Sequence, residues 1–226
     1  HNTALSIVDC VTSLGACNVP VDEWELDIVA SGSQKGYMIP PGLSFISMSQ
    51  KAWEAAEKSN LPKFYLNLKS YRKSLLSNSN PYTPAVNLVF ALDEALKMMR
   101  EEGLDNIFLR HNKHKLAMSN AVKALNLKLF ADEKYLSPSI TAIKTEGIDA
   151  EEFRKTIKNN FDILLAGGQD HLKGKIFRVG HLGYVNDRDI ITVVSAMSNT
   201  LLKLGKISAQ QAGEALVVAS RYLEEN

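Results

Sequence analysis

Three short apolar segments near the N-terminus constrain the fold more than any other feature of the sequence. Residues 4–8 (ALSIV), 27–30 (DIVA) and 43–48 (LSFISM) have the short, nearly continuous apolar character of buried strands. A helical pattern over residues 51–58 follows the third segment. Short strands that alternate with loops and helices predict an α/β sheet rather than a helical bundle.

The rest of the chain predicts a second, mixed unit. Residues 61–76 mix aromatic and basic side chains and predict a helix, and the next helical pattern ends near Gly103. Further helices are predicted at 104–125, 149–160, 187–204 and 208–223, and further strands at 127–130, 139–144, 161–165 and 175–179. We therefore expect a first domain over residues 1–105 and a small α+β domain over residues 106–226.

The charges of the chain are nearly balanced, with 26 lysines and arginines, 25 aspartates and glutamates, and a net charge of +1. Nucleic-acid-binding proteins usually gather an excess of basic residues on one face. The basic run at 110–115 (RHNKHK) lies inside a helical pattern, and we expect it to be a solvated helix face. The composition therefore predicts no nucleic-acid partner.

The cysteine count limits the metal and redox chemistry of the chain. Cys10 and Cys17 are too few for a disulfide scaffold or a tetrahedral metal site, so we expect no metal and reduced thiols in the cytoplasm. No apolar run reaches the roughly 18 residues of a membrane helix, and no signal-peptide pattern is present. The chain begins at His1 without a methionine, immediately before a strand-like run, which predicts a fragment or a processed piece.

One lysine stands out as a candidate for covalent chemistry. Lys35 lies in the stretch 31–42 (SGSQKGYMIPPG), among small residues and before a Pro-Pro-Gly turn. Small residues allow a planar group to approach the backbone, and the prolines and glycines fix the path of the chain. Lysine can form a Schiff base with an aldehyde cofactor, so we place the chemistry here.

An acidic residue is predicted to lie near this lysine. Asp9 follows the first strand, and Lys35 lies in a turn after the second. In a parallel sheet both positions meet at one edge, where open α/β sheets bind ligands. A pyridoxal phosphate enzyme needs such a pair, because a carboxylate keeps the pyridine nitrogen protonated. The alternative is that Asp9 only forms a turn or caps a helix.

An arginine in the second half is a candidate for carboxylate binding. Arg178 lies in a predicted strand before residues 180–183 (GHLG), whose two glycines leave space around the guanidinium group. A bidentate arginine–carboxylate contact fixes the orientation of a ligand. The alternative is a structural arginine paired with Asp187 or Asp189. His181 is expected to be structural.

Four segments resemble the class V pyridoxal-phosphate-dependent aminotransferases: 8–15 (VDCVTSLG), 31–35 (SGSQK), 40–42 (PPG) and 177–184 (FRVGHLGY). The chain is similar to the alanine–glyoxylate, serine–glyoxylate and serine–pyruvate aminotransferases, including the bacterial branch labelled a soluble hydrogenase subunit. The resemblance covers essentially the whole chain. It implies fold type I, with the C-terminal half of a large, mainly parallel-sheet domain and a small α+β domain.

The resemblance also implies roles for residues of the first domain. Lys35 would carry the aldimine with pyridoxal 5'-phosphate and would shuttle a proton during amino transfer. Asp9 would pair with the pyridine nitrogen, Val11 would pack on one face of the ring, and Gln34 would lie near the phosphate.

Three further residues gain expected roles from the same resemblance. Tyr82 and Thr83 lie on the loop that would reach the cofactor phosphate of a partner subunit in a homodimer. Arg178 would bind the substrate carboxylate. The expected reaction is amino transfer between a small amino acid, alanine or serine, and a 2-oxo acid, glyoxylate or pyruvate.

The resemblance leaves part of the site unaccounted for. The family's phosphate loop and its ring-stacking aromatic residue have no counterpart in this sequence, so the 226-residue chain alone is expected to bind the cofactor weakly and to lack turnover. The alternatives are a non-catalytic dimerising fragment or another class V enzyme. A cysteine desulfurase is less favoured because both cysteines precede residue 18.

Overall fold

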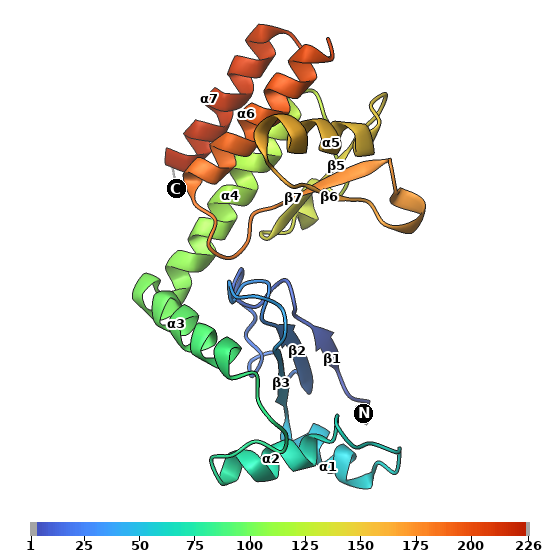
Figure 1. The fold of residues 1–226 in the computed structure, drawn as a ribbon, viewed down its shortest axis with the longest axis vertical. Helices are drawn as coiled ribbons and strands as arrows, with labels where there is room; N and C mark the ends of the chain where they lie inside the picture. The colour runs from blue at the N-terminus through green and yellow to red at the C-terminus, as the bar shows by residue number, and fades with distance from the viewer. Residues whose placement is uncertain (1–3, 225–226) are drawn as a thin grey trace. The chain divides into compact units, whose positions relative to one another are not determined.

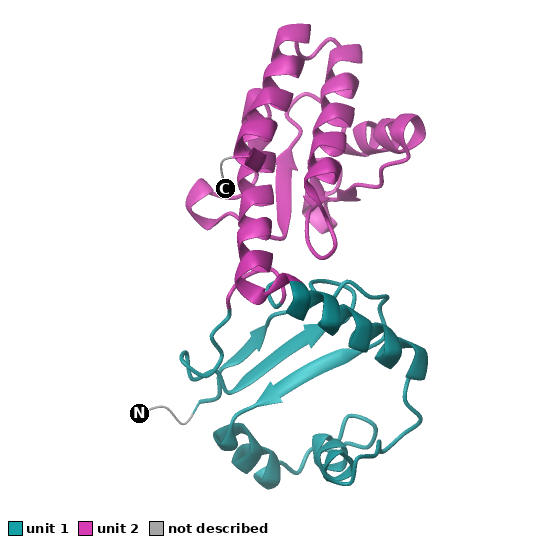
Figure 2. Cartoon of the chain, turned by 90° about the vertical axis from the view of Figure 1, so that its left-hand side faces the viewer, with its two compact units in different colours: residues 1–14, 19–101 teal, residues 15–18, 102–226 magenta. Residues whose placement is uncertain are grey.

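The computed structural model of the chain describes residues 4–224. The chain divides into two compact units, which Figure 2 shows in different colours. Unit 1 contains the residues up to 14 together with 19–101, and unit 2 contains residues 15–18 together with those from 102 onwards.

Unit 1 contains a three-stranded mixed sheet (Figure 1). Its strands are β1 (Ile7–Asp9), β2 (Ile28–Gly32) and β3 (Ser44–Met48), in the order β1-β2-β3. The β1–β2 pair is parallel, with Asp9 opposite Ala30, and the β2–β3 pair is antiparallel. The three predicted strands are confirmed, although the first begins only at Ile7. The expected mainly parallel character holds for the β1–β2 pair alone in the described sheet.

A buried aspartate joins the start of this sheet to the helix that follows it. Asp27 accepts hydrogen bonds from the Ser6 backbone N–H (2.9 Å), the Ser49 hydroxyl (2.8 Å) and Lys51 Nζ (3.0 Å). These donors, the Ser6 amide foremost, lower the pKa of Asp27 to about 2. The carboxylate therefore ties three separate segments together at the end where β2 begins.

The helices of unit 1 are α1 (Gln50–Lys58), α2 (Leu68–Leu76) and α3 (Val86–Glu102). Ser49 caps α1 by accepting a hydrogen bond from the Ala52 N–H. The helix predicted over 61–76 is wrong in its first half, because Asn67 caps α2 through the Lys69 N–H and the preceding residues form turns.

Unit 2 contains an antiparallel sheet with helices (Figure 1). The strands are β4 (Lys128–Leu129), β5 (Ile140–Lys144), β6 (Ala166–Gly167) and β7 (Ile176–Gly180), in the order β4-β5-β7-β6. The helices are α4 (Leu104–Ala124), α5 (Ala150–Phe161), α6 (Asp187–Lys203) and α7 (Ala209–Glu224), with short 3-10 turns at Glu133–Tyr135 and Asp170–Leu172.

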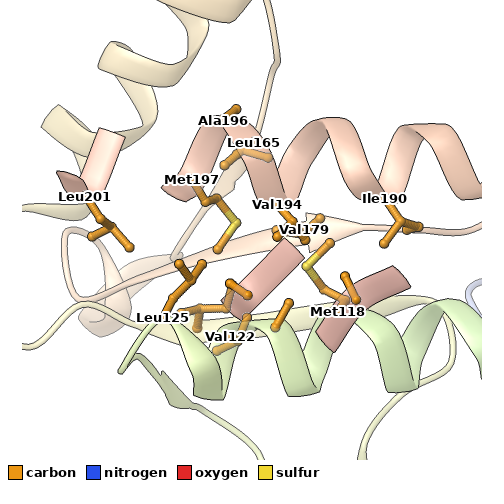
Figure 3. Close-up of a cluster of buried hydrophobic side chains, with 14 of the residues drawn as sticks. Met118, Val122, Leu125, Leu165, Val179, Ile190, Val194, Ala196, Met197 and Leu201 are labelled. Atoms are coloured by element: carbon orange, nitrogen blue, oxygen red, sulfur yellow. The ribbon is translucent and has the colours of Figure 1, made fainter. Parts of the chain in front are cut away.

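The core of unit 2 is formed by α4, α5, α6 and α7 together with the sheet, and Figure 3 shows part of it. Figure 3 labels Met118, Val122 and Leu125 on α4 and Val179 on β7. It also labels Leu165, which precedes β6, and Ile190, Val194, Ala196, Met197 and Leu201 on α6. The rings of Phe153 and Phe177 pack 5.0 Å apart in the same core.

The predicted strand at 161–165 is wrong. Helix α5 continues to Phe161 and ends at Asp162, whose backbone is left-handed (φ 54°). Leu165 is buried in the core just before β6, so the apolar pattern of this segment reflects burial rather than a sheet ladder. The residues that pair with β7 on this side are Ala166 and Gly167, just after the predicted strand.

The interpretation of residues 110–115 as a solvated helix face is also wrong. His111 and His114 are fully buried, and Arg110 makes a salt bridge with Glu102. The two histidines share one face of α4 with the buried residues Ile107 and Met118, because the spacings of three and four residues bring side chains into line. Among residues 4–224, no helix combines the length and the apolar character needed to cross a bilayer.

Candidate active site

Asp9 lies at the end of the parallel β1–β2 pair. Its side chain is exposed, and its Oδ1 accepts a hydrogen bond of 2.9 Å from the backbone N–H of Val11. The Cys10 N–H donates to the Ala30 carbonyl (2.8 Å), which continues the pairing one step past the strand. The carboxylate is therefore held by a local turn at the sheet edge.

Lys35 lies in the turn that follows β2 at the same edge. Strand β2 runs two residues beyond Ala30 to Gly32, and the turn then closes with a 2.9 Å hydrogen bond from the Met38 N–H to the Lys35 carbonyl. The side chain is half-buried, and Lys35 Nζ has no hydrogen-bond or salt-bridge partner among residues 4–224. Because the pair is parallel, Asp9 at the last position of β1 and Lys35 in the turn after β2 both lie at the carboxyl ends of their strands, as the sequence predicted.

A buried serine that sequence reasoning missed closes the loop around this lysine. The Ser33 hydroxyl donates to the Pro40 carbonyl (2.8 Å) and accepts from the Leu43 N–H (3.2 Å). The Ser33 backbone also donates to the Leu43 carbonyl and accepts from the Ile39 N–H. With an exposed fraction of 0%, Ser33 holds both arms of the loop that carries Lys35.

Replacing Ser33 with alanine is expected to reduce the free energy of unfolding by about 1–2 kcal/mol, because two part-buried backbone groups, the Pro40 carbonyl and the Leu43 N–H, lose their partner. Urea unfolding followed by circular dichroism measures this change. Ser47→Ala, at an exposed position of β3, is the control and should shift stability by less than about 0.5 kcal/mol. Equal effects of the two substitutions would contradict the role assigned to Ser33.

The residues around Lys35 leave little space for larger side chains. A Cβ atom at Gly32 would lie 3.0 Å from Gln34 Oε1, so the glycine allows the exposed Gln34 side chain to lie over β2. Tyr37 packs its ring against Phe45 with the centroids 4.7 Å apart. Burial raises the pKa of Tyr37, and a hydrogen bond with Ser31 acts in the opposite direction.

The predicted phosphate-reaching loop has one half-buried and one exposed side chain. Tyr82 is half-buried, its hydroxyl donates to the Phe64 carbonyl (3.1 Å), and its ring lies 4.8 Å from that of Tyr65. Thr83 is exposed. The Tyr82 hydroxyl thus makes a hydrogen bond within unit 1, whereas the Thr83 side chain is exposed to solvent.

Arg178 lies in unit 2, in the middle of β7. Its neighbours across the sheet are Ala142 on β5 and Ala166 on β6, and these small residues leave room beside its long side chain. Arg178 Nε donates to the Gly167 carbonyl (2.9 Å). Within the described chain, its two terminal nitrogens have no hydrogen-bond partner. They are therefore available to a ligand with two acceptor oxygens.

The alternative pairing of Arg178 with an acid of α6 is wrong. Asp187 instead contacts Lys113 Nζ (2.9 Å) and His114 Nε2 (2.9 Å). Asp189 accepts a hydrogen bond from the backbone of Asn186, the residue that caps α6.

The donor set at the edge of the unit 1 sheet suits a pyridoxal cofactor. Lys35 offers an amine with no partner among the described residues, Asp9 offers a carboxylate, and the β2 end is made of small residues. Among residues 4–224, no cluster of three or more His, Cys, Asp or Glu side chains could hold a metal ion.

Comparisons with known proteins agree with this chemistry. The model of the family described as aminotransferase class-V matches residues 1–190. A soluble hydrogenase small subunit from Synechococcus sp. (strain PCC 6716) is 56% identical over 99% of this chain and 58% of its own length. A serine–glyoxylate aminotransferase from Methylorubrum extorquens is 36% identical over 99% of this chain and 57% of its own.

A solved structure is also similar. The ureidoglycine–glyoxylate aminotransferase of Bacillus subtilis superimposes with a TM-score of 0.89 at 31% identity, covering 96% of this chain and 58% of the other. The chain thus spans a little over half the length of the relatives it matches.

Proposed function

Because the chain belongs to the class V aminotransferases, we propose that it forms part of an enzyme that transfers an amino group between alanine or serine and glyoxylate or pyruvate. The arrangement that supports this proposal is the parallel β1–β2 pair, which brings Asp9 and the amine of Lys35, unpartnered among the described residues, to one sheet edge. Two of the similar proteins are named for glyoxylate, which supports that acceptor.

The family uses pyridoxal phosphate, whose ring supplies an electron sink for the bond broken at the substrate Cα. Lys35 would hold the cofactor through Nζ and would carry the proton that leaves the substrate Cα. Asp9 would stabilise a protonated pyridine nitrogen, and the turn formed with the Val11 N–H would keep its carboxylate in place. Val11 would cover one ring face, and Gln34 would lie near the phosphate.

The remaining roles involve a second subunit and the substrate. In a homodimer the exposed Thr83 would reach the phosphate held by the partner subunit, and Tyr82 would shape that loop through its bond to the Phe64 carbonyl. Arg178 would bind the substrate carboxylate with its two terminal nitrogens.

The domain division and the extent of the active enzyme are part of the same proposal. Residues 1–105 would belong to the large domain of fold type I and residues 106–226 would form the small domain. Because the chain spans 58% and 57% of the two relatives compared, the activity is proposed for the whole protein and not for these 226 residues alone.

A half-reaction screen of the full-length protein tests this function. Alanine or serine, added without an acceptor, should convert bound cofactor from its aldehyde form to its amine form, and glyoxylate should restore the original absorbance. Glycine and cysteine serve as comparison donors, with cysteine reporting on desulfurase activity. A spectrum that alanine and serine both leave unchanged would refute the proposed donors.

A further inference from the structure

Both backbone groups of one glycine are held by neighbouring residues of α4. Gly183 lies between β7 and α6 with a left-handed backbone (φ 79°). Its N–H donates to His111 Nε2 (3.1 Å), and its carbonyl accepts from Arg110 Nη1 (2.9 Å). The same Nη1 donates to the Val185 carbonyl (3.0 Å). Two adjacent side chains of α4 therefore fix this turn from both directions.

The two side chains that hold the turn are themselves held. Glu102 accepts from Arg110 Nε (2.6 Å) and Nη2 (3.0 Å), a bidentate pair that orients the guanidinium group. His111 Nδ1 lies 2.7 Å from the Ile107 carbonyl, so it carries the proton and leaves Nε2 as the acceptor that the Gly183 N–H requires. We call Glu102, Arg110 and His111 the Gly183 clamp.

The segment before the clamp is tied to the sheet by a second buried histidine. The His181 N–H donates to the Ser139 carbonyl (3.0 Å), which extends the pairing of β7 by one residue. The His181 ring lies 2.8 Å from the Thr141 hydroxyl and 3.0 Å from the Pro138 carbonyl. Between the end of β7 and the turn, the chain is therefore anchored at His181 and again at Gly183.

The end of β7 depends on this support. Arg178 pairs with Ala166, and on that side of the described sheet β7 has no strand partner at Val179 or Gly180. On the other side, β5 pairs as far as Gly180. A strand end paired on one side moves more freely unless the following residues are anchored.

We infer that the Gly183 clamp is a positioning device for Arg178, keeping the end of β7 in the geometry in which the guanidinium group binds a carboxylate. This inference rests on the proposed function, because it takes Arg178 as the substrate-binding arginine. Glu102, Arg110 and His111 act through the turn and not by contact with substrate.

The test compares Arg110→Met with Arg110→Lys in the full-length enzyme. The methionine removes all the clamp's guanidinium bonds, and the lysine keeps the charge but cannot bridge two carbonyls and a carboxylate. Arg110→Met should raise the KM for the amino acid about 10- to 100-fold with kcat changed about twofold or less, as expected for a displaced binding group. Arg110→Lys should shift KM less, in the same direction. Arg188→Met, at an exposed arginine of α6, is the matched control.

Two further measurements distinguish a failure of the clamp from a failure of the proposed function. Hydrogen exchange of the peptide spanning 181–187 should accelerate in Arg110→Met and not in Arg188→Met, and unchanged exchange would overturn the clamp. If Arg178→Lys raises KM and Arg110→Met does not, the clamp is overturned while the proposed function stands. If Arg178→Lys leaves KM unchanged, the carboxylate role of Arg178 is overturned together with the purpose of the clamp.

Discussion

Replacement of Lys35 by alanine is expected to lower the transamination rate of the full-length enzyme by at least about 10³-fold, because in the proposed function the side chain serves both as nucleophile and as proton carrier. Lys35 carries the only amine side chain in residues 31–42. Stopped-flow spectroscopy of the half-reaction and steady-state turnover both measure the loss.

Two substitutions control for charge and for surface lysines. Lys35→Arg keeps the positive charge but offers no nucleophilic amine, so its activity should fall as far as that of the alanine variant. Lys58→Ala, at an exposed position in the last turn of α1, should leave activity unchanged. Transamination that survives in Lys35→Ala would show that the lysine is wrongly assigned.

The second large effect concerns acid stability. Burial lowers the pKa of His181 from 6.5 to about 4 in the folded protein. Between these values the unfolded chain binds a proton that the folded chain does not, so stability rises with pH and falls on acidification. Acidification from pH 6.5 to 4 should therefore remove about 3 kcal/mol through His181. Burial also lowers the pKa values of His111 and His114, which adds loss in the same direction.

Urea unfolding at several pH values measures this dependence. His181→Gln should make the unfolding free energy depend less on pH between pH 6.5 and 4, although His111 and His114 will keep part of this dependence. His171→Gln, at an exposed position, is the matched control and should leave the slope intact. A wild-type unfolding free energy that is constant across this range would contradict the burial-driven shift.

The sheet edge with Asp9 and Lys35 was predictable because its signals are local. An apolar strand followed by an acid, and a second strand followed by small residues and a lysine, specify a parallel pair with both groups at one edge. Ser33 was missed because its partners are seven and ten residues away and meet only when the loop closes. A serine among small residues carries no signal of that kind.

The surroundings of Arg178 and the burial of the α4 histidines could not be predicted from the sequence and became visible only in the tertiary structure. The alanines beside Arg178 lie on β5 and β6, which flank β7 on opposite sides, and β5 and β7 are not consecutive in the chain, so this register cannot be read from the sequence. The polar residues at 110–115 suggest that this helix face is exposed to solvent, but neighbouring elements of unit 2 bury His111 and His114. The spacing of these histidines from Ile107 and Met118 was the available signal.

The network of Asp27 has a consequence for how this scaffold can change over time. It anchors the sheet of unit 1 where β2 begins, whereas Asp9 and Lys35 follow the opposite ends of their strands. The register of β1, β2 and α1 is therefore secured by groups that take no part in the chemistry. Substitutions in the loops after β1 and β2 can therefore change the candidate site without resetting the strands, so the scaffold can vary at this end of the sheet while its register is kept.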